Sequence, residues 1–283
     1  MNSKQTVLNL KDNTSIGITT FQAESSDAAI LVLYPAFGVT ATYYQYFAAK
    51  LATAGITVVT ADLRGHGLSS VRPNKDNNYG FLEMINDLKA ILDHLKQANS
   101  RSKIYLLGHS LGGQAASLMM AKYPKSYDGL TIIGSPNVYY KGWSGFHYYR
   151  RKIGLNLLPA IGKVVSLLPP FKIGGYYTTP KQMIEWGHTG KTGNYKVIGD
   201  DFDYEKGFSK VTVPILAIDI EGDLMAPKAA MTNLYQKFKN TIALSTLTLT
   251  KKKTSLKITH INWPRTAEAV MVEVLREWID RSN

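Results

Sequence analysis

The chain has 283 residues, of which 45% are hydrophobic, and it contains no cysteine. This length and composition suit one large domain, or a core with an inserted segment, and exclude a chain that is disordered throughout. The lack of cysteine excludes disulfides, thiolate nucleophiles and cysteine-bound zinc.

The net charge is +12 and is unevenly distributed. Between Pro136 and Gly199, nine lysines and arginines stand against one acidic residue, Glu185, and a second basic run covers residues 251–253. A basic surface of this kind often has no role beyond contact with solvent. The alternative interpretation is that it binds an anionic substrate or, less favoured, an anionic membrane surface. No nucleic-acid-binding motif accompanies the charge, so we expect no nucleic-acid partner.

The sequence gives no sign of a targeting or membrane-spanning segment. Its N-terminus opens no apolar stretch of the signal-peptide type, and no run reaches the roughly 18 apolar residues of a spanning helix. We therefore expect a soluble, cytoplasmic protein. The pattern leaves the oligomeric state unknown.

The first elements in chain order are a hairpin and then alternating strands and helices. Residues 6–10 and 15–21 alternate in polarity around Asp12-Asn13, which predicts a β-hairpin at a sheet edge. Further strands are expected at 28–34, 56–61, 104–107 and 130–133, and helices at 43–54, 81–98 and 111–122. Because strands and helices alternate, we expect an α/β fold with a mostly parallel sheet and helices on both faces.

The alternation stops after Gly134-Ser135-Pro136 and resumes at Val213. The intervening sequence is aromatic and basic, and prolines at 159, 169, 170 and 180 are expected to divide it into short helices. We interpret residues 137–210 as an inserted helical cap, with residues 1–136 and 211–283 forming the core. A lid over a substrate pocket is favoured over a second small domain, because the insertion leaves from the carboxyl edge of a strand, where α/β sheets bind ligands.

Three aromatic residues of this insertion, Tyr140, Trp143 and Trp186, are the candidates for lining the pocket. After the insertion, the pattern predicts a strand at 213–220, a helix at 227–239, a strand at 242–250, an extended piece at 256–259 and an amphipathic helix at 264–281.

A G-x-S-x-G pattern, Gly108-His109-Ser110-Leu111-Gly112, lies between the predicted strand 104–107 and the predicted helix 111–122. A strand that runs directly into a helix makes a sharp turn, and glycines on either side leave room where a Cβ would clash. Such a turn exposes the hydroxyl of Ser110 at the carboxyl edge of the sheet. The alternative is an ordinary glycine-rich turn with no chemical role.

A serine hydroxyl is a poor nucleophile unless a base takes its proton and a third group orients the base. For a serine on such a turn, the expected chain order is serine, acid, histidine. Three carboxylates, Asp219, Glu221 and Asp223, follow the predicted strand 213–220. Asp223 is preferred because it lies furthest into the loop and Gly222 lets the chain turn before it; Asp219 is the competitor.

Of the six histidines, His260 alone follows the acid and is the candidate base. His94 is expected on a helix surface, and His109 is expected to be structural. A tetrahedral intermediate also needs two N–H donors for its oxyanion. The amide of Leu111 is one candidate, and the loop after strand 28–34 offers Phe37, with Ala36 as the second choice.

Three stretches resemble the α/β-hydrolase superfamily: the turn Gly108–Gly112, the loop Asp62-x-Arg64-Gly65-His66-Gly67-x-Ser69, and the loop Gly222-Asp223-x-x-Ala226-Pro227. The resemblance implies that Ser110 is the nucleophile, Asp223 the acid and His260 the base, with Phe37 and Leu111 at the oxyanion positions. Where the family often has His-Gly, this chain has Pro35-Ala36. The stretch Pro169-Pro170…Gly174-Gly175…Trp186 and Tyr195 is similar to a group of bacterial hydrolases of unsettled substrate.

The resulting hypothesis is a serine hydrolase, most simply a carboxylesterase that cleaves a small-molecule acyl ester or thioester without metal or cofactor. The aromatic insertion favours an apolar acyl group, and its basic charge tolerates an anionic one. An acyltransferase or cofactor-free perhydrolase on the same triad is the first alternative. A non-catalytic binding protein on this scaffold is the second. Relatives that open epoxides or remove halides use aspartate at the position of Ser110, which disfavours those reactions.

Overall fold

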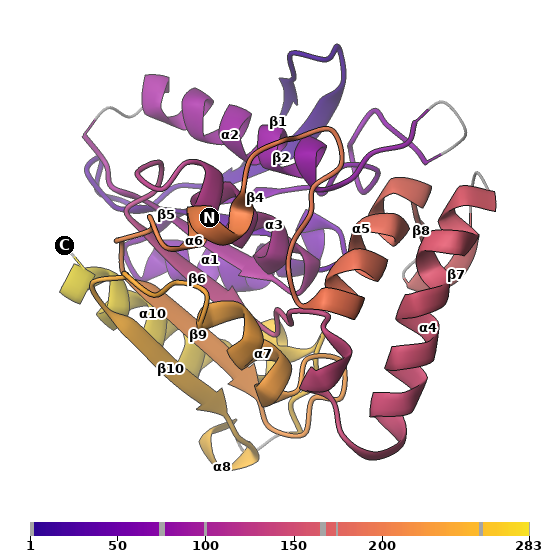
Figure 1. Ribbon diagram of the computed structural model, residues 1–283. Coiled ribbons are helices and arrows are strands. Elements are labelled where there is room, and N and C mark those ends of the chain that lie inside the picture. The colour runs from indigo at the N-terminus through magenta and orange to yellow at the C-terminus, as the bar shows by residue number, and fades with distance from the viewer. Residues whose placement is uncertain are drawn as a thin grey trace.

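The computed structural model describes residues 3–73, 77–98, 101–164, 168–173, 175–254 and 257–282. Its centre is an eight-stranded sheet (Figure 1). In spatial order the strands are β1 (Ser3–Asn9), β2 (Ser15–Phe21), β4 (Thr57–Ala61), β3 (Ile30–Tyr34), β5 (Ile104–His109), β6 (Gly129–Ile133), β9 (Ile215–Ile220) and β10 (Leu244–Leu249). The strands from β4 to β10 are parallel, and β1 and β2 form an antiparallel hairpin at the edge. The predicted α/β fold is confirmed.

Helices cover both faces of the sheet, and its central strands are therefore buried on both sides. Alternate residues of β3 enter different cores: Val32 and Tyr34 belong to one, Leu31 and Leu33 to the other. The first core is closed by α2 (Phe81–Ala98), α3 (Leu111–Lys122), α6 (Tyr204–Phe208) and α7 (Lys228–Tyr235), and the second by η1 (Ala41–Tyr44), α1 (Gln45–Thr53), α9 (Trp263–Thr266) and α10 (Glu268–Ser282).

Two C-terminal predictions need correction. The helix expected over 264–281 is two helices that meet at Ala267, and α7 ends at Tyr235 rather than at 239. In the extended piece expected at 256–259, Leu256 lies outside the described residues, and residues 257–259 form no strand. A short helix, α8 (Lys251–Thr254), follows β10.

Between β6 and β9 the chain leaves the sheet and forms an inserted segment. It contains η2 (Tyr140–Gly142), α4 (Gly145–Val164), a hairpin of β7 (Leu168–Ile173) and β8 (Tyr176–Thr178), and α5 (Pro180–Thr192). The helices α4 and α5 pack side by side beyond the sheet (Figure 1). Gly174, which is part of the stretch that resembles a group of bacterial hydrolases, lies outside the described residues.

The division of this segment into short helices was wrong at Pro159, which lies inside the 20-residue helix α4. Proline in a helix interior removes one backbone hydrogen bond and crowds the preceding turn. Here its ring packs against Gly187 of α5, where a Cβ would lie 2.3 Å from Pro159 Cγ. The close approach of the two helices therefore compensates for the proline. Pro180, in contrast, starts α5 behind the capping residue Thr179.

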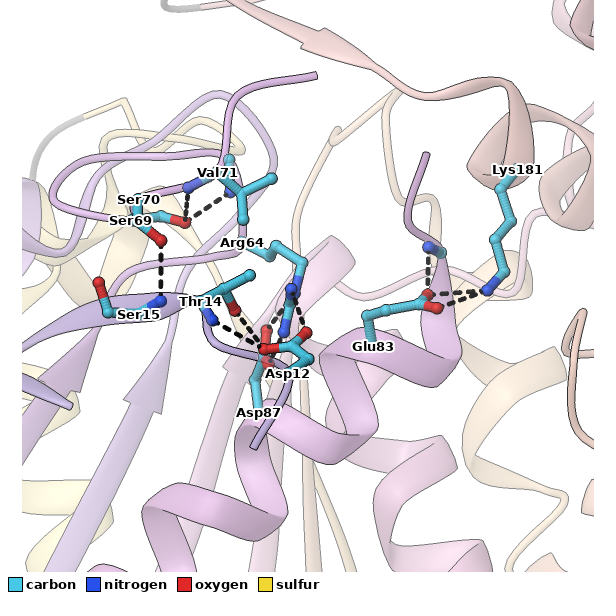
Figure 2. A network of polar contacts seen from close by, with 12 residues as sticks. Asp12, Thr14, Ser15, Arg64, Ser69, Ser70, Val71, Glu83, Asp87 and Lys181 are labelled. Carbon is cyan, nitrogen blue, oxygen red and sulfur yellow. Dashed lines mark hydrogen bonds and ion pairs between the residues drawn. The ribbon is translucent and has the colours of Figure 1, made fainter. Parts of the chain in front are cut away.

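Polar contacts join the inserted segment to the start of α2. The Lys181 ammonium pairs with Glu83 at 2.7 Å (Figure 2). The buried carboxylate of Glu185 accepts hydrogen bonds from the Phe81 and Ile198 amides, both at 2.9 Å. Glu185 is the single acidic residue of the basic stretch 136–199, and it fixes α5 to the core. In the described part of the chain, no helix has the length and apolar character to cross a bilayer.

We predict a pH-dependent effect of Glu185→Gln on stability. Burial raises the pKa of Glu185 to about 7, from an ordinary value of 4.5. Between these values the folded protein keeps a proton that the unfolded chain releases, so this contribution to stability is lost as the pH rises through the window. Relative to Glu185→Gln, the free energy of unfolding of the wild type should fall by on the order of 2 kcal/mol between pH 5 and pH 8.

Urea unfolding at four pH values measures this difference. Glu273→Gln, at an exposed position of α10, is the matched control for removing a carboxylate. A difference between wild type and Glu185→Gln that stays constant with pH would contradict the prediction.

Candidate active site

Ser110 occupies the turn between β5 and α3, in a backbone conformation that non-glycine residues rarely adopt. Its φ is 52° and its ψ is −114°. The flanking glycines are required sterically: a Cβ at Gly112 would lie 2.2 Å from the Tyr34 carbonyl oxygen, and one at Gly108 would lie 2.4 Å from the Gly113 Cα. The predicted strand–turn–helix is confirmed, and the turn leaves Ser110 partly exposed.

The structure brings Ser110, His260 and Asp223 together from three separate parts of the chain. His260 Nε2 lies 2.9 Å from Ser110 Oγ, and His260 Nδ1 lies 2.7 Å from Asp223 Oδ2. The imidazole is buried, with 6% of its side-chain surface exposed. With a carboxylate facing Nδ1, the proton of a neutral imidazole belongs there, which leaves Nε2 free to accept the serine proton.

The loop after β9 fixes the carboxylate of Asp223. Gly222 has a φ of +73°, and the chain turns there as the sequence predicts. Asp223 Oδ1 accepts hydrogen bonds from the amides of Met225 at 2.8 Å and Ala226 at 3.2 Å, which leaves Oδ2 for His260. The competing Asp219 is buried within β9, and its described contacts do not include His260.

The two residues expected to supply oxyanion donors are Phe37 and Leu111, and the structure shows what their backbone amides contact. Within the part of the chain that the structure describes, neither donates a hydrogen bond, and both residues line the same cavity as Ser110. The Gly112 amide donates to the Pro35 carbonyl at 3.0 Å and holds the loop after β3 against the turn. The second choice for this role, Ala36, is engaged elsewhere because its amide donates to the Tyr44 hydroxyl.

His66 supports this loop, a role that the sequence reasoning missed. Its Nε2 accepts a hydrogen bond from the Gly38 amide at 3.0 Å, one residue beyond Phe37, and its Nδ1 donates to the Arg64 carbonyl at 3.1 Å. Burial lowers the pKa of His66 to about 4, so the ring is neutral at physiological pH and can accept. Tyr176 of β8 stacks on the ring at 4.1 Å.

A buried ion pair anchors the segment that carries His66. The guanidinium of Arg64 makes two hydrogen bonds to Asp87 of α2, at 3.0 and 2.6 Å, and also pairs with Asp12 in the β1–β2 turn (Figure 2). The signal for His66 was present in the motif that contains it, but its partner, Gly38, is a backbone amide that side-chain patterns do not reveal.

His109 is structural, as expected, and sits directly beneath the site. Its Nδ1 lies 2.6 Å from the Tyr44 hydroxyl, which also accepts from the Ala36 amide. Its ring centroid is 5.1 Å from that of His260. Burial lowers the pKa of His109 well below its ordinary value, so its ring is neutral and adds no positive charge next to His260. The exposed His94 is on α2, as predicted.

A cavity of about 380 Å³ opens in front of Ser110. Most of its wall is apolar, and its polar residues are Ser110, Gln114, Arg150 and Arg151. The remaining lining residues are Phe37, Leu111, Pro136, Val138, Gly154, Leu155, Leu157, Leu158, Ile161, Trp186 and Met225. Residues 150–161 of this wall all belong to α4, so the inserted segment forms one side of the cavity.

Of the three pocket candidates, only Trp186 lines the cavity; Tyr140 and Trp143 were wrong. Tyr140 packs against Tyr139 and Tyr148, with ring centroids 5.1 and 5.2 Å away. Trp143 is turned toward the loop after β9, where its indole N–H donates to the Leu224 carbonyl at 2.9 Å. Tyr140 is thus packed among neighbouring tyrosines and Trp143 is bonded to a main-chain carbonyl, which keeps both rings out of the cavity wall.

A mostly parallel sheet in this strand order, with a serine on the turn after its central strand, defines an α/β-hydrolase. The chain belongs to the family described as serine aminopeptidase, S33, whose match covers residues 25–170, slightly more than half of the sequence. The structural likeness extends further. Est1E from Butyrivibrio proteoclasticus with ferulic acid bound has a TM-score of 0.68 at 15% identity, over 98% of both chains.

Curated relatives match shorter segments. Protein phosphatase methylesterase 1 of Debaryomyces hansenii is 40% identical over 79 residues, which are 26% of this chain and 20% of the relative. Monoacylglycerol lipase of Mycolicibacterium smegmatis is 24% identical over 147 residues, 52% of this chain and 48% of the relative. The chain thus spans between a fifth and a half of the length of these relatives.

We predict that His66→Phe slows the reaction of Ser110 with a fluorophosphonate about tenfold to a hundredfold, because the loop that presents the Phe37 amide loses its support. Phenylalanine keeps the ring that stacks on Tyr176 but removes the acceptor for the Gly38 amide. The second-order rate constant of labelling measures the effect. The control is His94→Phe on the exposed face of α2, and equal rates for the two variants would contradict the role of His66.

Proposed function

We propose that this protein is a serine hydrolase, most simply a carboxylesterase that cleaves an acyl ester or thioester. One observation carries the proposal: a single imidazole, that of His260, lies within hydrogen-bond distance of both the Ser110 hydroxyl and the Asp223 carboxylate. In this arrangement His260 takes the proton of Ser110 as the hydroxyl oxygen attacks the substrate carbonyl. Asp223 orients the ring and stabilises the imidazolium that forms.

The negative charge of the tetrahedral intermediate falls on the former carbonyl oxygen. The free amides of Phe37 and Leu111 are the proposed donors to that oxygen, and each such donor typically contributes about 3 kcal/mol to the transition state. Collapse of the intermediate releases the alcohol or thiol, which receives the proton from His260 and leaves an acyl group on Ser110. A water molecule activated by the same imidazole then hydrolyses the acyl-enzyme.

The cavity supports an ester rather than a peptide substrate. An aminopeptidase must bind the positively charged amino terminus of a peptide, which favours a carboxylate in the pocket. The described lining residues include Arg150 and Arg151 and no acidic side chain. A largely apolar wall with two cations instead suits an apolar acyl group. We further propose that the inserted segment acts as a lid, because its helix α4 forms one side of this cavity.

The same triad would serve an acyltransferase or a perhydrolase, in which an alcohol, an amine or peroxide replaces water as the acceptor. Product analysis with these acceptors in competition separates them from hydrolysis. A cytoplasmic location stays a prediction from the sequence.

We predict that a fluorophosphonate labels the wild type and leaves Ser110→Ala unlabelled, because no other serine among the described residues has a hydroxyl within hydrogen-bond distance of a histidine. Hydrolysis of 4-nitrophenyl butyrate should fall at least about a thousandfold in Ser110→Ala. The exposed Ser144→Ala is the matched control and should behave as wild type. Equal labelling of wild type and Ser110→Ala, or no turnover of short and long 4-nitrophenyl esters by the wild type, would overturn the proposal in favour of a binding protein.

We also predict that Asp223→Asn lowers kcat for 4-nitrophenyl butyrate by on the order of a thousandfold, since the amide can present N–H to Nδ1 and favour the wrong tautomer of His260. The control is Asp219→Asn, which replaces the other buried aspartate of the same strand and loop. Its kcat should stay within about threefold of wild type. A larger loss for Asp219→Asn than for Asp223→Asn would reverse the assignment of the acid.

A further inference from the structure

Two neighbouring arginines of α4, Arg150 and Arg151, lie in the wall of the cavity that contains Ser110. Neither has a carboxylate within salt-bridge distance among the described residues. Two lysines near the inserted segment do have such partners: Lys181 pairs with Glu83, and Lys237 pairs with Glu205. The cavity thus holds positive charge that no described carboxylate neutralises by direct contact.

Arg151 is held in place by an aromatic ring rather than by an acid. Its guanidinium carbon lies 4.5 Å from the centroid of Trp143, whose indole N–H is fixed to the Leu224 carbonyl. Stacking on tryptophan leaves the N–H donors at the edge of the guanidinium plane available. Burial and the adjacent Arg150 lower the pKa of Arg151, and the Asp223 carboxylate raises it only in part, so the charged form of Arg151 is on balance disfavoured there.

The polarity of the cavity changes along α4. Residues 150, 154, 158 and 161 recur at helical spacing on the face that lines the cavity, and the sequence changes along it from arginine to leucine and isoleucine. Arg150 and Ile161 are eleven residues apart in one helix, which corresponds to about 16 Å along its axis. One cavity therefore offers a cationic end and an apolar end to the same substrate.

We propose that Arg150 and Arg151 form an anion subsite, and that the natural substrate is an amphipathic ester or thioester with a carboxylate or phosphate remote from the scissile carbonyl. This inference rests on the proposed esterase function and adds the substrate class. Arginine binds both groups well because its planar fork donates two parallel hydrogen bonds. A bound anion would also neutralise the mutual repulsion of the two guanidinium groups.

Three substrates test the proposal in steady-state kinetics. They are 4-nitrophenyl octanoate, which is neutral; mono-4-nitrophenyl suberate, which has the same chain length and a terminal carboxylate; and octanoyl-coenzyme A, whose phosphates lie on the leaving group. Arg151→Gln should lower kcat/KM for at least one anionic substrate by about tenfold to a hundredfold, mainly through KM. Turnover of the neutral ester should change less than about threefold.

The anionic substrate that loses activity identifies the side of the scissile bond that the arginines contact. Lys152→Gln is the matched control, because Lys152 is exposed on the same helix and does not line the cavity. It should affect none of the three substrates. If Arg151→Gln folds poorly, Arg151→Lys and Arg150→Gln give the same test with a smaller change. Equal losses on neutral and anionic substrates, or no loss on either anion, would overturn the subsite.

Binding separates this inference from the esterase function itself. In the Ser110→Ala background, calorimetry with mono-4-nitrophenyl suberate and octanoyl-coenzyme A measures affinity without turnover. We expect a Kd for one of them that rises about tenfold or more when Arg151→Gln is added. If the arginine-dependent affinity is found but the wild type cleaves no ester, the proposed function fails and the subsite stands. If the affinities do not depend on Arg151, the proposed anion subsite is wrong and the proposed esterase function is unaffected.

Discussion

The strained backbone of Ser110 is the constraint on which the rest of the site depends. A φ of 52° at a residue with a side chain is unfavourable by about 1–3 kcal/mol and persists only when the surroundings enforce it. Here the enforcement is steric: a Cβ at Gly108 would clash with the start of α3, and one at Gly112 would clash with the end of β3. The amide of Ser110 also donates to the Ile133 carbonyl of the neighbouring strand. The fold thereby fixes the serine where His260 can reach it.

The loop after β3 is the second part of the site, and the turn that carries Ser110 holds this loop in place. The hydrogen bond from the Gly112 amide to the Pro35 carbonyl ties the loop after β3 to the same turn that strains Ser110. From the other side, the neutral ring of His66 accepts a hydrogen bond from the Gly38 amide. The same ring donates to the Arg64 carbonyl, and the guanidinium of Arg64 is anchored by Asp87. The buried Arg64–Asp87 ion pair thus helps to hold the loop after β3 in a conformation in which the amides of Phe37 and Leu111 have no described acceptor. In the mechanism proposed above these amides bind the oxyanion, and a loop that is held in place before substrate arrives keeps the reorganisation small.

Local patterns predicted the elements that local physics determines. The glycines around Ser110 and the chain order of Asp223 and His260 were readable because the turn and the order of strands constrain them directly. The continuous helix through Pro159 was not, since it depends on Gly187, which is distant in the sequence and close only after α4 and α5 pack. Tyr140 and Trp143 failed as pocket residues for a similar reason: composition marks a segment as aromatic but does not say which rings satisfy each other. His66 was missed because its partner is a main-chain amide.

The environments of the buried Arg64 and the half-buried Arg151 differ in a way that separates a structural role from a binding role. Arg64 is buried and makes ion pairs with Asp87 and Asp12, so its charge is compensated within the fold. Arg151 is half-buried, and it stacks on the uncharged face of Trp143 without a described ion pair. An uncompensated charge at a site of low polarity is unfavourable, and proteins ordinarily pair such groups. If Arg151 served stability alone, an uncharged side chain of similar shape would pack on Trp143 at least as well. The Asp223 carboxylate offsets the charge of Arg151 only in part, and an anion that enters the cavity beside Ser110 would complete the compensation.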